Sequence, residues 1–232
     1  MPPVSATPMT IEGEGGVAVS GLLETPPGAR ACLVLTHGAG AGMQHPFMAA
    51  AAAGLAERGI ASLRYQFPYM ERGSKRPDPP RVAQATVRAA VAAAACALPE
   101  LPLIAGGKSF GGRMTSQAQA AAPLPHVRGL AFFGFPLHPP DRPSTDRAAH
   151  LSEVKIPMLF LQGTRDAFAT LDRLRPVCAA LGPRATLKLF DDADHSFHVP
   201  ARTGRKDANV LNDVLDTFTV WLDGVLDDAA RQ

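Results

Sequence analysis

Short apolar runs alternate along this chain with longer segments in which apolar residues recur at helical spacing. A continuous apolar run such as Cys32 to Thr36 is typical of a strand that is buried on both faces of a sheet. The predicted strands are Val17 to Glu24, Cys32 to Thr36, Ile60 to Tyr65, Leu101 to Ala105, Val127 to Phe135, Met158 to Gln162 and Ala185 to Phe190.

Helices are predicted in the segments between most of these strands. Glycine or proline follows several of them, as Gly59 follows the first, because these residues end helices. Apolar residues of the last helix form a stripe at helical spacing. The predicted helices are Pro46 to Arg58, Val82 to Leu98, a segment from the Gly106–Gly112 turn to Ala122, Leu171 to Leu181 and Asp207 to Leu226. A proline-rich loop is predicted for Phe67 to Pro80.

Repeated strand–helix units predict the α/β class, with a mainly parallel sheet that is covered by helices on both faces. We expect one domain over residues 1–232, with its core at about residues 17–226, because the alternation contains neither a repeat nor a long linker. Only about twenty residues separate Phe135 from Ile156, which is too short for a lid domain. In such a sheet, binding and chemistry occur beyond the carboxyl ends of the strands.

The segment Gly107-Lys108-Ser109-Phe110-Gly111 fits the pattern G-x-S-x-G. It lies between a predicted strand and a predicted helix, which is the context that a nucleophile elbow requires. The two glycines leave room for the sharp turn that exposes the serine. We therefore interpret Ser109 as a candidate nucleophile. The alternative is a glycine-rich turn whose serine caps the following helix.

A serine hydroxyl is a weak nucleophile at neutral pH and needs a base, which in turn needs an orienting acid. Asp166 lies 57 residues after Ser109, in the turn that follows a predicted strand, and His195 lies 29 residues later, in the loop after the next strand. The chain order Ser, Asp, His is that of α/β-hydrolases. We predict that Asp166 orients His195 and that His195 activates Ser109.

Neighbouring residues leave alternatives open for both partners. Asp191, Asp192 and Asp194 lie close to His195 in the sequence, and each is otherwise explained as part of a solvated acidic turn. His198 lies three residues after His195, and its position alone does not exclude it as the base.

Acyl transfer also needs hydrogen-bond donors for the oxyanion that forms in the transition state. One donor is expected to be the amide of Phe110, and the other is expected from the loop after the Cys32–Thr36 strand. In that glycine-rich loop the amide of Ala39 or Gly40 is the candidate, because neither residue has a bulky side chain. A phosphate-binding loop is less favoured, since neither the P-loop ending nor the G-x-G-x-x-G register is present.

Composition and charge exclude several functional classes. The net charge of the 232 residues is +2 and the basic residues are scattered, which does not favour binding to nucleic acid or to an anionic membrane. The sequence has neither a signal-peptide pattern at its start nor an apolar segment long enough for a membrane span. Three widely separated cysteines favour reduced thiols and a cytoplasmic location. Metal-binding motifs are missing, so we expect neither a metal ion nor another cofactor.

Several residues are candidates for substrate binding. Gly40 belongs to the glycine-rich loop, and Tyr69 to the loop after the Ile60–Tyr65 strand. His138 lies in the loop after the central strand, and its default interpretation is a residue that caps, packs or faces solvent, with substrate contact as the alternative. Residues predicted either to line an apolar pocket or, for at least half of them, to pack in the core are Phe67, Tyr69, Phe110, Leu137 and Phe197. Candidates for binding an acidic group, with solvated surface as the default interpretation, are Arg64, Arg113 and Arg147.

Six ordered blocks, within a stretch from about Val17 to Leu226, are His37–Gly42, Arg64–Tyr69, Gly106–Arg113, Phe135–Pro140, Gln162–Asp166 and Ala193–Phe197. They resemble the α/β-hydrolase-like family of testis-expressed protein 30 and subunit 3 of the NSL chromatin complex, and more distantly the dienelactone hydrolases. The resemblance implies an α/β-hydrolase fold with Ser109 as nucleophile, Asp166 as acid and His195 as base. Dienelactone hydrolases use a cysteine nucleophile, whereas the elbow here carries a serine. Their substrate is therefore not expected for this chain.

The sequence thus predicts a carboxylesterase-like serine hydrolase that cleaves an ester or thioester of a small molecule without a cofactor. Amides are an alternative substrate class, because the same machinery acts on them. The competing hypothesis is a non-catalytic binding or scaffold domain with the same fold, against which the complete set of Ser109, Asp166 and His195 argues. A homodimer is left open as an assembly state.

Overall fold

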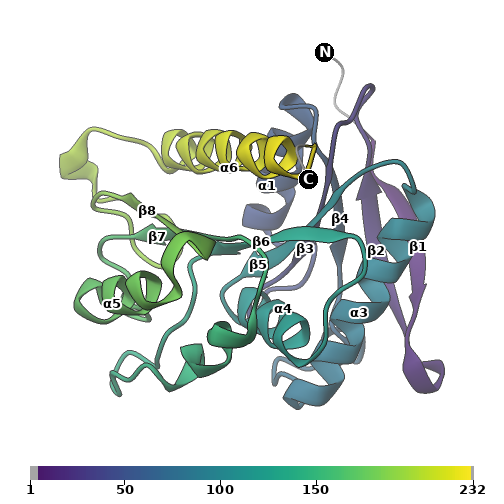
Figure 1. Cartoon of the computed structure of the whole chain (residues 1–232), viewed down its shortest axis with the longest axis horizontal. Coiled ribbons are helices and arrows are strands. Elements are labelled where there is room, and N and C mark those ends of the chain that lie inside the picture. Colours follow the sequence, from purple (N-terminus) through teal and green to yellow (C-terminus); the bar gives the residue numbers. More distant parts are fainter. Residues whose placement is uncertain (1–4, 231–232) are drawn as a thin grey trace.

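The computed structural model describes residues 5–230 and shows an eight-stranded sheet at the centre of the molecule (Figure 1). Residues 1–4 and 231–232, which the predicted domain includes, lie outside the described residues. The strands are β1 (Thr7–Glu12), β2 (Ala18–Glu24), β3 (Cys32–Thr36), β4 (Ala61–Tyr65), β5 (Leu103–Lys108), β6 (Val127–Phe133), β7 (Met158–Gly163) and β8 (Ala185–Phe190). Their order in the sheet is β1-β2-β4-β3-β5-β6-β7-β8.

The sheet is mainly parallel, as predicted. From β4 to β8 every neighbouring pair is parallel, whereas β2 is antiparallel to both β4 and β1. Parallel alignment brings the carboxyl ends of β3, β5, β6, β7 and β8 to the same edge of the sheet. The segments that carry the predicted site residues all begin at this edge.

Helices cover both faces of the sheet (Figure 1). They are α1 (Pro46–Glu57), α2 (Pro68–Glu71), α3 (Pro80–Ala97), α4 (Phe110–Ala121), α5 (Leu171–Leu181) and α6 (Asp207–Ala230). The pair α1 and α6 lies on one face, and α3, α4 and α5 lie on the other. Within residues 5–230, no helix combines the length and the apolar character needed to cross a membrane.

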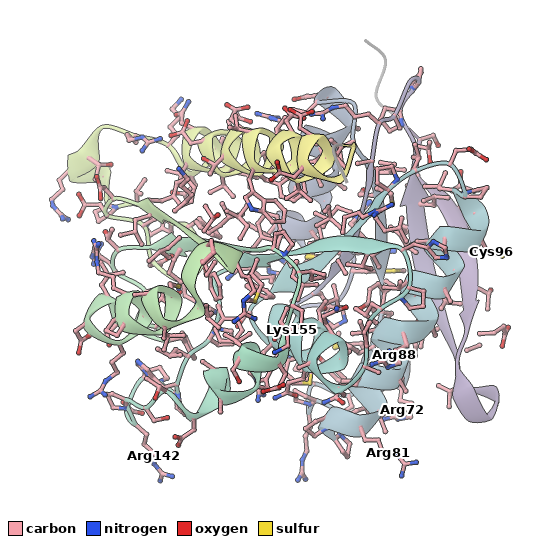
Figure 2. All side chains as sticks on the ribbon, in the orientation of Figure 1. Arg72, Arg81, Arg88, Cys96, Arg142 and Lys155 are labelled. Carbon is pink, nitrogen blue, oxygen red and sulfur yellow. The ribbon has the colours of Figure 1, made fainter. Side chains whose placement is uncertain are left out.

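Each helical layer buries its own apolar core against the sheet. Val34 of β3 faces the core under α3, α4 and α5, whereas Leu33 and Leu35 face the core under α1 and α6. This alternation along a continuous apolar strand follows from burial on both faces. Figure 2 shows side chains filling the space on both sides of the sheet, while the labelled Arg81 and Arg142 point outward.

The bounds of β3, α5 and β8 are those predicted, and several short elements are absent from the prediction. Strand β1 forms an antiparallel hairpin with β2, and helix α2 lies in the predicted loop from Phe67 to Pro80. A 3₁₀ helix spans Asp146–Glu153. These segments are too short or too exposed to display a period: in β1, for example, Ile11 is the single buried residue.

Arg64 of β4 forms a buried ion pair with Glu24 of β2. Both side chains are only 7% exposed, and Arg64 Nη1 also donates a hydrogen bond to the carbonyl of Met43 at 3.2 Å. The solvated position expected for Arg64 is therefore wrong. The charge is tolerated in the interior because a carboxylate and a carbonyl accept its hydrogen bonds.

Replacing Arg64 by Met should destabilise the protein by about 3–5 kcal/mol, because Glu24 is left buried without its partner. The double variant R64M/E24L should recover part of this loss, since it buries no unpaired charge. Urea unfolding measures both, and R202M, which removes an exposed ion pair, serves as the control with a loss of less than about 1 kcal/mol. A double variant as unstable as the sum of its two single variants would contradict the account of this pair.

Candidate active site

The turn between β5 and α4 holds Ser109 in a strained backbone conformation. Its φ is 51° and its ψ is −116°, a region that residues other than glycine rarely adopt. Gly107 and Gly111 make the turn possible, because a Cβ atom on either would lie 2.6 Å from the backbone oxygen of Thr36 or His37, respectively. The end of β3 therefore packs directly against the turn that presents the serine.

Three side chains from three different loops meet beside this turn. Ser109 Oγ lies 2.8 Å from His195 Nε2, and His195 Nδ1 lies 2.6 Å from Asp166 Oδ2. Since a carboxylate accepts hydrogen bonds, the imidazole donates its Nδ1–H to Asp166, and its Nε2 accepts the Ser109 hydroxyl. The structure thus brings together the three residues that the sequence predicts as nucleophile, base and acid.

The Asp166 carboxylate is buried and is held by its neighbours. Gln162 Nε2 donates a hydrogen bond to Oδ2 at 2.5 Å, and the Phe168 amide donates one to Oδ1 at 2.7 Å. With the bond from His195, the carboxylate accepts three hydrogen bonds while its side chain has no solvent exposure. These bonds satisfy a buried charge and fix the direction in which it faces the imidazole.

The pKa of His195 is lowered from its ordinary value, mainly because burial disfavours the charged imidazole. The hydrogen bond to Asp166 opposes this shift, and the cation of Lys108 adds to it. The ring of Phe168 packs against the imidazole with 4.4 Å between the ring centroids. His195 therefore remains neutral, and able to accept a proton, at a lower pH than an exposed histidine.

The alternative acids and the alternative base lie outside this arrangement. Asp191 is exposed, Asp192 forms an ion pair at the surface, and Asp194 Oδ1 accepts hydrogen bonds from two amides of its own loop at 2.7 and 3.0 Å. His198 is exposed, and its Nδ1 lies 2.9 Å from Asp207. None of these four residues forms a hydrogen bond with the Ser109 hydroxyl or with the half-buried His195 imidazole.

The glycine-rich loop after β3 is held beside the elbow by its own hydrogen bonds. His37 is fully buried, with its Nδ1 2.7 Å from the Gly38 carbonyl, and its Nε2 accepts the amide of Phe67 at 3.2 Å. The Gly40 amide donates to the hydroxyl of Tyr69 at 3.0 Å. The side chains of His37 and Tyr69 thus support the backbone of this loop.

Because the Gly40 amide already has a partner, Ala39 is the better candidate of the two for an oxyanion donor. A Cβ atom on Gly38 would lie 3.7 Å from Ser109 Cβ, which shows how closely the loop passes the serine. Ala39 follows Gly38 and lines the same cavity as Ser109. Phe110, the other predicted donor, begins α4 directly after the serine.

A cavity of about 360 Å³ opens beside Ser109 and His195. Phe47, Met48 and Phe168 supply much of its apolar wall. The residues predicted for an apolar pocket lie elsewhere, and all except the partly buried Phe110 are core residues: Phe67, Tyr69, Phe110, Leu137 and Phe197. Within residues 5–230, no group of three or more His, Cys, Asp or Glu side chains is arranged to hold a metal ion.

His138 lies in the core rather than on the wall of this cavity. Its Nδ1 lies 2.8 Å from the Pro139 carbonyl, and its Nε2 accepts the Thr170 amide at 3.4 Å. It thereby ties the loop after β6 to the segment that follows Asp166. Tyr69 and Gly40 hydrogen-bond to each other, and the residues that line this cavity include neither of them. Their contact with substrate, like that of His138, remains a prediction.

Several site residues are missing from the sequence prediction. The signal for them in the sequence is that they lie within four positions of Ser109 or Asp166: these residues are Lys108, Gln162 and Phe168. Phe47 and Met48 give no such signal, because apolar residues at the start of a helix are equally typical of a core. Their role depends on where α1 begins relative to the elbow.

A family model for an alpha/beta hydrolase domain matches residues 29–223. The chain belongs to the α/β-hydrolase family. This match does not distinguish the narrower group of testis-expressed protein 30 from other α/β-hydrolases, so membership of that group remains a prediction.

Solved structures of other α/β-hydrolases share this fold. A dienelactone hydrolase from Anabaena variabilis is 19% identical, with a TM-score of 0.76 over 95% of this chain and 98% of that one. A serine hydrolase without a lid from Xanthomonas campestris is 21% identical, with a TM-score of 0.72 over 94% and 96%. An esterase domain from Rhodothermus marinus is 15% identical, with a TM-score of 0.71 over 94% and 97%. The predicted α/β-hydrolase fold is thereby confirmed, and among the described residues 5–230 no lid interrupts it.

The two histidines of the β8–α6 loop should titrate on opposite sides of the ordinary histidine value of about 6.5. Burial lowers the pKa of His195, whereas the carboxylate of Asp207 raises the pKa of His198. NMR titration of the imidazole Cε1–H signals measures both values in one sample. Asp207→Asn should lower the pKa of His198 and leave that of His195 unchanged; a His195 value above 6.5 in the wild type would refute this account.

Proposed function

We propose that this α/β-hydrolase is a serine hydrolase that cleaves esters or thioesters of small molecules through an acyl-enzyme. The observation that carries the proposal is the continuous chain of hydrogen bonds, 2.8 Å from Ser109 to His195 and 2.6 Å from His195 to Asp166. The strained backbone of Ser109 supports it, because strain of this kind persists where the surrounding structure holds a residue for function.

In the first half of the reaction, Ser109 Oγ attacks the substrate carbonyl while His195 Nε2 takes the hydroxyl proton. Asp166 stabilises the imidazolium that forms and keeps Nδ1 protonated. The imidazolium then gives its proton to the departing alcohol or thiol, and the acyl group stays on Ser109. In the second half, His195 takes a proton from water, the hydroxide attacks the acyl carbonyl, and Ser109 recovers its proton as the acid leaves.

The amides of Ala39 and Phe110 are proposed to bind the oxyanion. Ala39 belongs to a loop that hydrogen bonds hold close to Ser109, and Phe110 is the first residue of α4, whose N-terminal end favours negative charge. Loss of one such donor typically raises the barrier by about 2.7–4 kcal/mol. Donors on a loop and a helix that the fold already holds beside Ser109 would need little reorganisation during the reaction.

Esterases among the structures with this fold favour this proposal over a scaffold role. A scaffold domain would need neither the strained serine nor a buried acid that accepts three hydrogen bonds. Within the α/β-hydrolases, the six sequence blocks lead us to place the chain with the group of testis-expressed protein 30 and NSL subunit 3. One member of that group belongs to a chromatin complex, and the scaffold hypothesis is kept as the competing function for this reason.

A fluorophosphonate probe should label the wild-type protein and fail to label Ser109→Ala. Ser116→Ala is the matched control, because Ser116 also contacts a histidine, with Oγ 2.7 Å from His150 Nε2, but is buried and donates its hydroxyl to the Arg113 carbonyl. This variant should be labelled like the wild type. Labelled protein is detected by fluorescence after electrophoresis, and folded wild type that takes up no probe would favour the scaffold function.

Short acyl chains should be preferred, because the cavity of about 360 Å³ lies near the small end of the range for ligand pockets. No lid among the residues that the structure describes encloses a longer chain. The values of kcat/KM for p-nitrophenyl acetate and butyrate should exceed that for the dodecanoate by about tenfold or more. Ser109→Ala gives the blank for spontaneous hydrolysis. A maximum at chains longer than about ten carbons would show that the substrate binds outside this cavity.

A further inference from the structure

Lys108, at a position that the elbow motif leaves free, carries its amine into the candidate active site. Its Nζ donates a hydrogen bond to the main-chain carbonyl of His195. The same amine lies 5.9 Å from the centroid of the Phe47 ring and 5.6 Å from that of Phe197. These contacts join the last residue of β5 to α1 and to the histidine loop, which are far apart in the sequence.

Gly134 leaves the space in which the amine and the imidazole face each other. A Cβ atom on this residue would lie 3.0 Å from Lys108 Nζ and 3.4 Å from His195 Cε1. The φ of Gly134 is +74°, which also favours glycine here. The amine of Lys108 and the Cε1 atom of the imidazole therefore border the same small space, while Ser109 and Asp166 contact the two ring nitrogens.

We propose that Lys108 is a positioning residue that anchors the loop of His195 and holds a positive charge beside its imidazole. The inference rests on the proposed function and adds a fourth residue to the three that sequence and geometry indicate. Lys108 acts through His195: its hydrogen bond goes to the backbone of the base, and its charge acts on the protonation of the base.

The charges around His195 explain why a cation is useful there. Asp166 and Asp194 both favour the imidazolium, whereas Lys108 opposes it, as does burial of the ring. A base that carried the two acidic influences alone would be protonated, and inactive, over a wider pH range. Burial lowers the pKa of Lys108 itself to about 8, so the amine is still charged at neutral pH.

The first test measures His195 directly and does not depend on catalysis. NMR titration of the full chain should show the pKa of His195 raised by about one unit in Lys108→Met and nearly unchanged in Lys108→Arg, which keeps the charge. Lys108→Gln provides a second neutral side chain if the Met variant does not fold. Lys155→Met removes a charge from an exposed lysine that follows the Asp146–Glu153 helix (labelled in Figure 2) and should leave the pKa of His195 unaffected. An unchanged His195 pKa in both neutral variants would overturn the proposal.

The second test follows kcat/KM for p-nitrophenyl acetate against pH. In Lys108→Met the acidic limb should move to higher pH by the same amount as the NMR value, and the plateau should fall by about tenfold as the loop loses its anchor. A lower plateau with an unmoved limb would indicate a structural role alone and contradict the proposal. A wild type that hydrolyses nothing, yet shows the NMR shift, would contradict the proposed function and leave the lysine's effect on His195 intact.

Discussion

The imidazole of His195 is held between a hydroxyl and a carboxylate that belong to other loops, and the rest of the site depends on this pair of hydrogen bonds. The three residues follow β5, β7 and β8, whose parallel alignment brings their carboxyl ends to one edge of the sheet. The order β5-β6-β7-β8 leaves β6 between the serine and its partners. Gly134, directly after β6, keeps that gap open where the imidazole must cross it.

Hydrogen bonds from neighbouring groups fix the positions of Asp166 and His195. Gln162 and the Phe168 amide fix the carboxylate, and Lys108 holds the backbone of the base. Most of these contacts come from residues within a few positions of Ser109, Asp166 or His195 in the chain. Short loops that begin at rigid strands can therefore hold both the reacting groups and their supports.

The positions of strands can be predicted from the sequence where both faces of the strand are buried, and less well where an element is short or exposed. The apolar run at Cys32 to Thr36 defines β3 fully, whereas β1 buries little and gives no comparable pattern. The triad follows from residue type and strand-end position, because chain order constrains it. The wall of the cavity does not follow: Phe47 and Phe67 are both aromatic residues near the same edge, and only the packing of α1 decides which of them faces the serine.

The central claim is that the Ser109 hydroxyl becomes a nucleophile, and trapping its acyl-enzyme tests this most directly. Wild-type protein is mixed with p-nitrophenyl acetate, quenched in acid within one turnover, digested and analysed by tandem mass spectrometry. We expect one acetyl group on Ser109, and none at this position in a sample left until hydrolysis is complete. An acetyl group on the Lys108 amine instead, or turnover that leaves Ser109 unmodified at every time point, would contradict it.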